Sequence, residues 1–152
     1  MAITIRPARP GDEPRWRALW TAYNRFYEHE VPEAVTRSTW SRILDPASSV
    51  HAVVAQDVDG TIIGFANYIV HDGTWSIESV CCLEDLYVDR ERRARGVGRL
   101  LIDWLIAEMV RNGWAKLYWI TRETNYRARA LYDTYTAHSG FLRYVIANRS
   151  EP

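Results

Sequence analysis

Apolar residues recur every three or four positions along several stretches of the chain, and this spacing predicts amphipathic helices. The first stretch runs from Asp12, its expected N-cap, to Tyr27. The second begins at Val97 and ends near Gly113, a residue type that often follows a helix C-terminus. Two shorter helices are expected at residues 37–44 and 125–135.

A different pattern fills the middle of the chain, where short apolar segments alternate with tight turns. Residues 50–56 and 62–70 are predicted strands joined by an Asp-Gly turn, and residues 75–88 are long enough for one extended strand. Short strands are also predicted at residues 3–6, 116–121 and 140–145. The fold class is therefore α/β, with a mixed, mostly antiparallel sheet in which only the later strands cross over in parallel.

The composition is that of an ordinary globular protein. With 152 residues, 47% of them hydrophobic and 25% charged, the chain has the size of a single domain over residues 1–152. Basic and acidic residues balance at 19 each, which disfavours a nucleic-acid partner held by bulk charge. No apolar run approaches the roughly 20 residues of a membrane helix, and the first residues do not resemble a signal peptide. We therefore expect a cytoplasmic protein with no membrane contact.

The cysteines and histidines predict neither a disulfide framework nor a metal site. Cys81 and Cys82 are adjacent, and they are expected inside a strand as small hydrophobic residues. The histidines lack the spacing of metal ligands and are interpreted as surface or internally satisfied residues: His29, His51, His71 and His138. No metal is therefore expected.

The segment from Leu86 to Leu101 carries the strongest chemical signal. A strand leads into a basic loop, then into Gly96 and Gly98, and then into a helix. Glycines let the backbone approach a ligand closely, and a helix N-terminus offers unpaired N–H groups to an anion. Five arginines add positive charge there: Arg90, Arg92, Arg93, Arg95 and Arg99. We interpret the segment as a pyrophosphate site; the alternative is a charged surface loop with a glycine kink.

Two common phosphate motifs do not match this segment. The P-loop sequence Gly-x-x-x-x-Gly-Lys-Ser/Thr is absent from the chain. A Rossmann fingerprint needs a third glycine where Leu101 stands, and it needs a βαβ series where this chain has a meander. A nucleotide-binding enzyme is therefore disfavoured.

The run Arg93-Ala94-Arg95-Gly96-Val97-Gly98 resembles the signature Arg/Gln-x-x-Gly-x-Gly/Ala of the GNAT superfamily of N-acetyltransferases. Three further segments resemble parts of this family in the same order: residues 3–12 its first strand and helix, residues 82–88 its fourth strand, and residues 125–132 with Gly140-Phe141 its closing motif. The resemblance covers nearly the whole chain. It implies the GNAT fold, a mixed, mostly antiparallel sheet with splayed central strands flanked by helices.

The resemblance implies acetyl-CoA as the donor and a primary amine as the acceptor, with direct attack in a ternary complex. Asn125 is expected to contact the pantetheine arm. The strand residues expected to pair with pantetheine through their backbones are Leu86, Tyr87 and Val88. The residues expected to bind the pyrophosphate through their amides are Arg93, Ala94, Arg95, Gly96, Val97, Gly98 and Arg99. A homodimer is also implied, because terminal strands of the family often form a dimer contact.

The resemblance also assigns catalytic roles. Tyr132 takes the position of the general acid, against the alternative of a core tyrosine with a satisfied hydroxyl, and the N–H of Leu86 is the expected oxyanion donor. Glu84 and Asp85 are adjacent in a strand, so they are expected to point to opposite faces. Similarity to the polyamine-acetylating branch favours Glu84 as the base, acting through water. The alternative is that Glu84 orients a cationic acceptor or pairs with an arginine.

The acceptor is less well specified, and polyamine-like small amines are the leading class. Acidic and aromatic side chains suit a cationic amine. The residues expected to contact it are Tyr27, Glu28, Trp75 and Asp85. The aromatic stripe of Trp16, Trp20 and Tyr23 is expected to be core packing instead. Seven residues, 133–139, separate Tyr132 from Gly140, more than is usual in the family, which affects the register of the last strand. The alternative function is a non-catalytic acyl-CoA-binding or sensing module.

Overall fold

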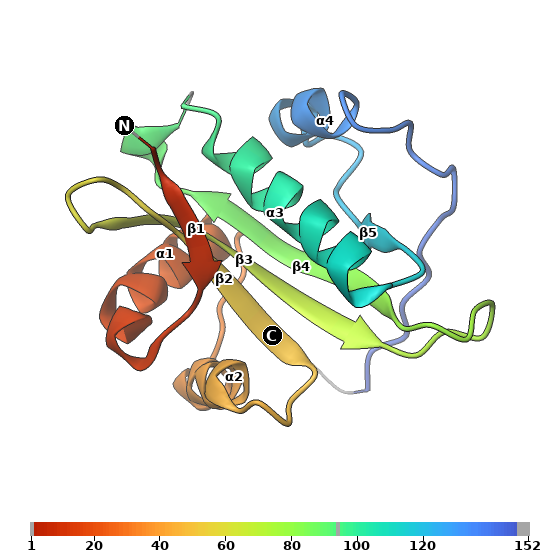
Figure 1. Cartoon of the computed structure of the whole chain (residues 1–152), viewed down its shortest axis with the longest axis horizontal. Helices are drawn as coiled ribbons and strands as arrows, with labels where there is room; N and C mark the ends of the chain where they lie inside the picture. Colours follow the sequence, from red (N-terminus) through yellow and green to blue (C-terminus); the bar gives the residue numbers. More distant parts are fainter. Residues whose placement is uncertain (1, 94, 149–152) are drawn as a thin grey trace. The chain divides into compact units, whose positions relative to one another are not determined.

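The computed structural model describes residues 2–93 and 95–148, and it divides the chain into two compact units (Figure 1). The first unit is Met1–Trp119 and the second is Ile120–Pro152. The sheet, the long helices and the glycine turn belong to the first unit. Each unit is described by itself below. Of the residues predicted to contact a ligand, Ala94 lies outside the described part of the chain.

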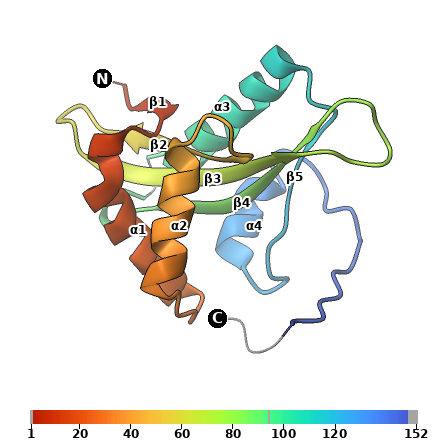
Figure 2. The ribbon, with the colours of Figure 1, turned by 90° about the horizontal axis from the view of Figure 1, so that it is seen from below.

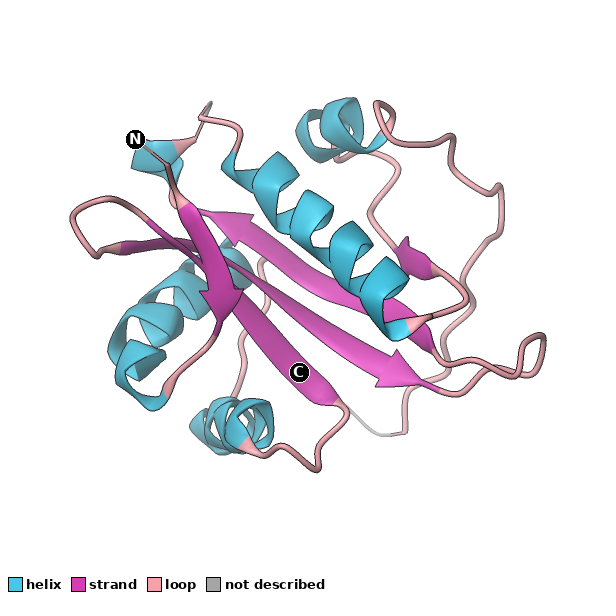
Figure 3. Cartoon of the chain, in the orientation of Figure 1, coloured by secondary structure: helices cyan, strands magenta, loops and turns pink. Residues whose placement is uncertain are grey.

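Within the described residues, five strands form one sheet in the order β1-β2-β3-β4-β5 (Figure 3). The first four strands pair antiparallel, and β5 pairs parallel with β4. The sheet is therefore mixed and mostly antiparallel, as the sequence predicted. Its strands are β1 (Thr4–Pro7), β2 (Val50–Gln56), β3 (Ile62–His71), β4 (Val80–Val88) and β5 (Leu117–Trp119).

Helices cover both faces of this sheet (Figure 2). Helices α1 (Glu13–Phe26) and α2 (Glu33–Leu44) lie on one face, and α3 (Val97–Asn112) lies on the other. Short 3₁₀ turns, η1 (Pro10–Asp12) and η2 (Arg90–Arg92), precede α1 and α3. Helix α4 (Tyr126–Tyr132) belongs to the second unit. Among the described residues, no helix has the length and apolar character needed to cross a membrane.

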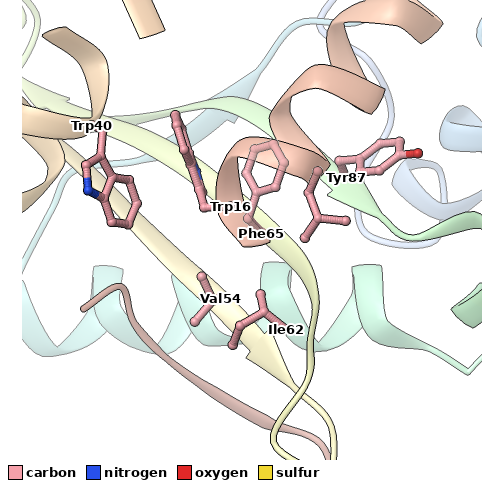
Figure 4. Close-up of a cluster of buried hydrophobic side chains, with 7 residues drawn as sticks. Trp16, Trp40, Val54, Ile62, Phe65 and Tyr87 are labelled. Atoms are coloured by element: carbon pink, nitrogen blue, oxygen red, sulfur yellow. The ribbon is translucent and has the colours of Figure 1, made fainter. Parts of the chain in front are cut away.

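The α1 face holds an aromatic core (Figure 4). Trp16 is fully buried and packs on Trp20, Trp40 and Phe65 with ring centroids 5.0 to 6.1 Å apart. Tyr23 stacks on Trp20 at 5.7 Å, so the expectation that this aromatic stripe is core packing is confirmed. The cluster of buried residues comprises Trp16, Leu19, Trp40, Val54, Ile62, Phe65 and Tyr87.

Several predicted boundaries of helices and strands differ from the structure, and β5 has three residues where residues 116–121 were predicted. Helix α2 begins at Glu33 rather than at residue 37, because the carbonyl of Pro32 already accepts hydrogen bonds from the amides of the first turn. Strand β4 begins at Val80 rather than at residue 75, because Trp75 and Ile77 project into solvent from a bent loop. Helix α4 is shorter than predicted and ends at Tyr132.

Asp12 does not cap α1 as predicted. Its carboxylate accepts two hydrogen bonds from the guanidinium of Arg6, at 2.8 and 2.9 Å, and one from the amide of Arg9 at 2.8 Å. No side-chain cap bond from Asp12 to α1 is present in the described structure. The ion pair with β1 therefore uses the oxygens that a cap would need, and it lowers the pKa of Asp12 chiefly through the hydrogen bond from Arg6.

The strand predicted at residues 140–145 does not form in the structure, although these residues are described. The second unit contains α4 but no described strand that could pair with this segment. A lone strand leaves its N–H and C=O groups without partners, so it gains no sheet hydrogen bonds. The apolar side chains of the segment and of the residue that follows it are exposed: Phe141, Leu142, Tyr144, Val145 and Ile146.

Gly64 allows β3, β4 and the start of α3 to pack closely. A Cβ at this position would lie 2.9 Å from the carbonyl oxygen of Tyr87 and 3.4 Å from Cγ1 of Val97. The contact with the carbonyl oxygen of Tyr87 is too short for a methyl group unless the backbone of β3 or β4 moves, whereas the contact with Val97 is a close van der Waals contact. Gly64 therefore allows the close approach of β3 to the backbone of β4 beneath Val97 of α3.

We expect Gly64→Ala to lower the free energy of unfolding by about 1–3 kcal/mol, because the added methyl group overpacks a rigid contact. Urea denaturation followed by circular dichroism measures this change. Gly73→Ala is the matched control, since a Cβ there meets only the side chain of Val80 at 3.7 Å. Equal stability of the two variants would contradict this account of Gly64.

Candidate functional site

Strands β4 and β5 pair over only part of their length. Cys81, Cys82 and Leu83 pair with Leu117–Trp119, and β5 then ends. In the described part of the first unit, no strand lies beside residues 84–88 of β4 on that side. The open edge that remains is a row of backbone groups that can pair with an extended ligand.

The pairing of β3 with β4 determines which backbone groups face the open edge. The amide of Asp89 donates to the carbonyl of Ile63, so this opposed pair is a hydrogen-bonded one. Hydrogen-bonded and non-hydrogen-bonded pairs alternate along an antiparallel ladder. Tyr87, opposite Phe65, therefore directs its backbone groups toward β3, whereas Leu86 and Val88 direct theirs toward the open edge.

This register corrects one expectation. Of the three residues predicted to pair with pantetheine, Tyr87 cannot offer backbone groups to the open edge, because β3 uses them. Its ring is buried beside Phe65 and Tyr23 on the α1 face. The carbonyl of Val88 accepts a hydrogen bond from Nε of Arg93 at 3.0 Å. The N–H of Leu86 is thus a well-placed donor on this edge.

A β-bulge in β4 places two carboxylates on one face of the sheet. Asn67 lies opposite Asp85 and Tyr68 lies opposite Leu83, so Glu84 is an extra residue without a partner on β3. Cys82 and Asp85 are opposite Ile69 and Asn67, which are two positions apart on β3 and so share a face. The thiol of Cys82 donates to Oε1 of Glu84 at 3.3 Å, which places Glu84 on that face as well.

The prediction that Glu84 and Asp85 point to opposite faces is therefore wrong. That prediction assumed strict alternation, and a bulge interrupts alternation by one residue. Glu84 is exposed, whereas Asp85 is partly buried next to α1. Burial is the main cause that raises the pKa of Asp85, and the charge of the nearby Glu84 adds to this shift.

Asp85 is held by a hydrogen-bonded chain that enters the core. Nδ2 of Asn67 donates to its carboxylate at 3.0 Å, and the indole N–H of Trp16 donates to Oδ1 of Asn67 at 3.3 Å. Tyr23 also donates to Asp85. Burial raises the pKa of Asp85, while the bonds from Asn67 and Tyr23 oppose that shift by stabilising the carboxylate. Asp85 is thereby fixed in position.

Glu84 is connected to a second chain on the β5 side. Tyr118 is the partner of Cys82 in the pairing of β4 with β5, and its hydroxyl lies 2.7 Å from Nε2 of His71. Nδ1 of His71 lies 2.8 Å from the carbonyl of Asp72, so both ring nitrogens are satisfied. The interpretation of His71 as an internally satisfied residue is confirmed. Among the described residues, no cluster of histidine, cysteine and carboxylate side chains could hold a metal ion.

The glycine turn begins α3 as expected. Gly96 has a left-handed backbone with φ of 73°, and its carbonyl accepts from the amide of Leu100 at 3.0 Å. In the described structure, no side chain caps this N-terminus. Val97 is buried and anchors the first turn in the core. The amides ahead of α3 and the dipole of a 16-residue helix can therefore act on an anion.

The arginines of the loop do not all contribute free positive charge. Arg92 and Arg95 both pair with Asp57, a residue of the turn between β2 and β3. The guanidinium of Arg93 lies over the ring of Tyr87, 5.3 Å from its centroid. The expectation of five uncompensated positive charges around the turn is thus corrected, because two of the arginines share one carboxylate, which offsets one of their two charges.

The remaining predicted residues lie in different places. Asn125 and Tyr132 belong to the second unit, where Asn125 is the N-cap of α4 and Tyr132 is its last residue. They are seven residues apart, which is about two helical turns, so they lie on the same face of α4. Nδ2 of Asn125 donates to the hydroxyl of Thr121 at 3.0 Å. Tyr27 packs on Tyr23 at the end of α1, with Glu28 after it in a left-handed backbone.

Trp75 lies apart from the glycine turn. It belongs to the loop between β3 and β4, at the opposite end of the sheet from the start of α3 (Figure 1). Its side chain is 90% exposed. A role for Trp75 in acceptor binding remains a prediction.

The profile of the acetyltransferase (GNAT) family matches residues 16–135. The chain belongs to this family. It is 36% identical over 131 residues to a D-amino-acid N-acetyltransferase of Saccharomyces cerevisiae, which covers 86% of this chain and 81% of the yeast protein. The family consists of acyltransferases, and the mixed α/β sheet described above is the GNAT fold.

Solved structures agree with this fold. A ribosomal-protein-alanine N-acetyltransferase from Brucella melitensis biovar Abortus 2308 superposes with a TM-score of 0.80 at 22% identity, covering 97% of this chain and all of that one. AAC(6')-Iy in complex with the bisubstrate analog CoA-S-monomethyl-acetylneamine also gives a TM-score of 0.80 at 22% identity, with full coverage of both chains. At these identities the likeness shows the GNAT fold alone.

Cys81 and Cys82 are buried, and burial is the main cause that raises the pKa of each thiol to about 12. Because the thiolate is the reactive form, we expect the native GNAT chain to be almost inert to a disulfide reagent such as DTNB at pH 8. Unfolding in urea exposes both thiols, and the titre should then rise to 2 per chain. Rapid reaction of the native protein would contradict the buried placement of these residues.

Proposed function

We propose that the chain transfers the acetyl group of acetyl-CoA to a primary amine by direct attack in a ternary complex. The open edge of β4, which leads into the uncapped N-terminus of α3, carries this proposal. An extended pantetheine arm can pair with Leu86 at that edge, and a diphosphate can bind the amides from Arg93 to Arg99. Asn125 is assigned to the pantetheine arm. The residues present thus fit an acyl-CoA.

The chemistry follows from the needs of amide formation. The amine must be neutral when it attacks, so Glu84 accepts its proton, through water, on the exposed side of the bulge. The N–H of Leu86 stabilises the oxyanion, and Tyr132 donates a proton to the leaving thiolate. Acetyl-CoA supplies the activated acyl group.

We assign a small cationic amine as the acceptor. Two carboxylates, Glu84 and Asp85, lie on one face of β4, and such a pair favours a positively charged group. The yeast relative is named for D-amino acids, and AAC(6')-Iy was solved with an acetylneamine analog, so amines are acceptors or acceptor parts in both. Unlike an amino acid, a polyamine has no carboxylate that the negative charges of Glu84 and Asp85 would repel.

An amine panel tests this function. We expect free thiol to be released from acetyl-CoA only when an amine is present, with polyamines giving a higher kcat/KM than D-amino acids or an aminoglycoside. DTNB detects the thiol, and mass spectrometry identifies the acetylated product. Tight binding of acetyl-CoA without turnover of any amine would instead support a non-catalytic acyl-CoA-binding module. Failure to bind acetyl-CoA would reject both.

We expect Glu84→Gln and Tyr132→Phe each to lower kcat by about 10²-fold, because each removes a proton-transfer group, while the affinity for acetyl-CoA changes little. Steady-state kinetics at several pH values measures kcat, and calorimetry measures affinity. Glu78→Gln and Tyr126→Phe are matched controls, since both residues are exposed and have no assigned role. An unchanged kcat in Tyr132→Phe across pH would reject the acid assignment.

A further inference from the structure

The carboxylate of Asp57 links the loop before α3 to the turn between β2 and β3 through ion pairs with Arg92 and Arg95. Asp57, in the turn between β2 and β3, accepts from Nη1 of Arg92 at 2.5 Å and from Nη1 and Nη2 of Arg95 at 2.7 and 3.2 Å. Its side chain is only 4% exposed, whereas the two arginines are partly exposed. The contacts join residues 35 and 38 positions apart in sequence.

The turn that carries Asp57 is itself well fixed. The amide of Asp57 donates to the carbonyl of Thr61 at 2.8 Å, and its carbonyl accepts from Gly60 at 3.0 Å. The amide of Val58 donates to Oδ1 of the Asp57 carboxylate at 2.8 Å. The hydrogen bond from Arg95 lowers the pKa of Asp57 to about 2, so the carboxylate remains ionised at neutral pH.

A second ion pair fixes the other end of the same loop. Arg15 of α1 contacts Asp89 at 2.5 Å and donates from Nε to the carbonyl of Ile62 at 2.8 Å. Asp89 in turn accepts from the amide of Glu91 at 3.1 Å and so begins η2. Asp89 at the start of the loop and Arg95 near its end are thus both held by ion pairs to other elements.

We propose that Asp57 is a positioning residue for acyl-CoA binding, which acts through Arg92 and Arg95 to hold the loop amides in place for the diphosphate. The inference rests on the proposed function, because the diphosphate is that of acetyl-CoA. A loop ordered before binding loses less conformational entropy when the ligand binds. The two arginines then serve to shape the loop, while its amides and the start of α3 bind the anion.

The test compares Asp57→Asn with the wild-type chain, using CoA as the probe in calorimetry and acetyl-CoA with an active amine in kinetics. We expect the Kd of CoA and the KM of acetyl-CoA to rise about tenfold, while kcat and the KM of the amine stay within about twofold. Asp59→Asn is the matched control, because Asp59 lies in the same turn and its exposed carboxylate accepts from the amide of Thr61, whereas the hydrogen bonds of Arg92 and Arg95 go to Asp57. Asp57→Glu keeps the charge and should restore part of the affinity.

Two results would overturn the proposal. Unchanged CoA affinity in folded Asp57→Asn would show a role in stability alone, and tighter binding would show that Asp57 withholds the arginines from the phosphates. If Asp57→Asn does not fold, Arg92→Gln removes one of the two ion pairs, and about threefold weaker CoA binding is expected. A wild-type chain that fails to bind CoA rejects the proposed function itself, whereas wild-type binding with an unaffected Asp57→Asn rejects only this inference.

Discussion

The hydrogen-bond register of β4 is the constraint on which the candidate site depends. One extra residue at Glu84 moves the strand out of phase, so that residues before and after the bulge present different sides to their neighbours. Before it, the amide of Cys81 donates to the carbonyl of Lys116 and joins β4 to β5. After it, Leu86 faces an edge that β5 no longer covers. The same displacement brings Glu84 onto the face of Asp85.

The rest of the first unit holds this strand in place. The ring of Tyr87 is packed among Phe65 and Tyr23, and Asp85 is bonded through Asn67 to Trp16. These contacts fix β4 from the α1 side, and Gly64 lets α3 approach it closely from the other. A ligand that pairs with the open edge therefore meets a strand whose side chains are packed and hydrogen-bonded on the α1 side.

Much of the architecture was predictable from the sequence, because local patterns specify it. Strand β2 and helix α3 have the predicted bounds, since β-branched apolar residues and a terminal glycine mark them clearly. The arginine–glycine signature located the start of α3 and pointed to the GNAT family. The prediction of a terminal strand at residues 140–145 was wrong, because an apolar segment forms a strand only where a partner strand is available to pair with it.

The details of the candidate site were less predictable, because they depend on contacts between distant residues. The Asp57 turn was recognised, but nothing local shows that its carboxylate meets Arg92 and Arg95. The bulge is likewise invisible in the run Leu83-Glu84-Asp85, because it appears only when β4 is aligned against β3. Asn67 and Tyr118 carried no motif and emerge only as partners of predicted residues.

The bulge has a consequence for how such a protein can change over time. Glu84 has no residue opposite it on β3 and its side chain is exposed, so a different side chain at position 84 meets no cross-strand neighbour and no core contact. Its neighbour Asp85 is anchored in the core and does not share this freedom. The fold thus places a residue whose exchange leaves the packing unchanged beside one that is anchored, so the chemistry at position 84 can diverge while the scaffold is inherited intact.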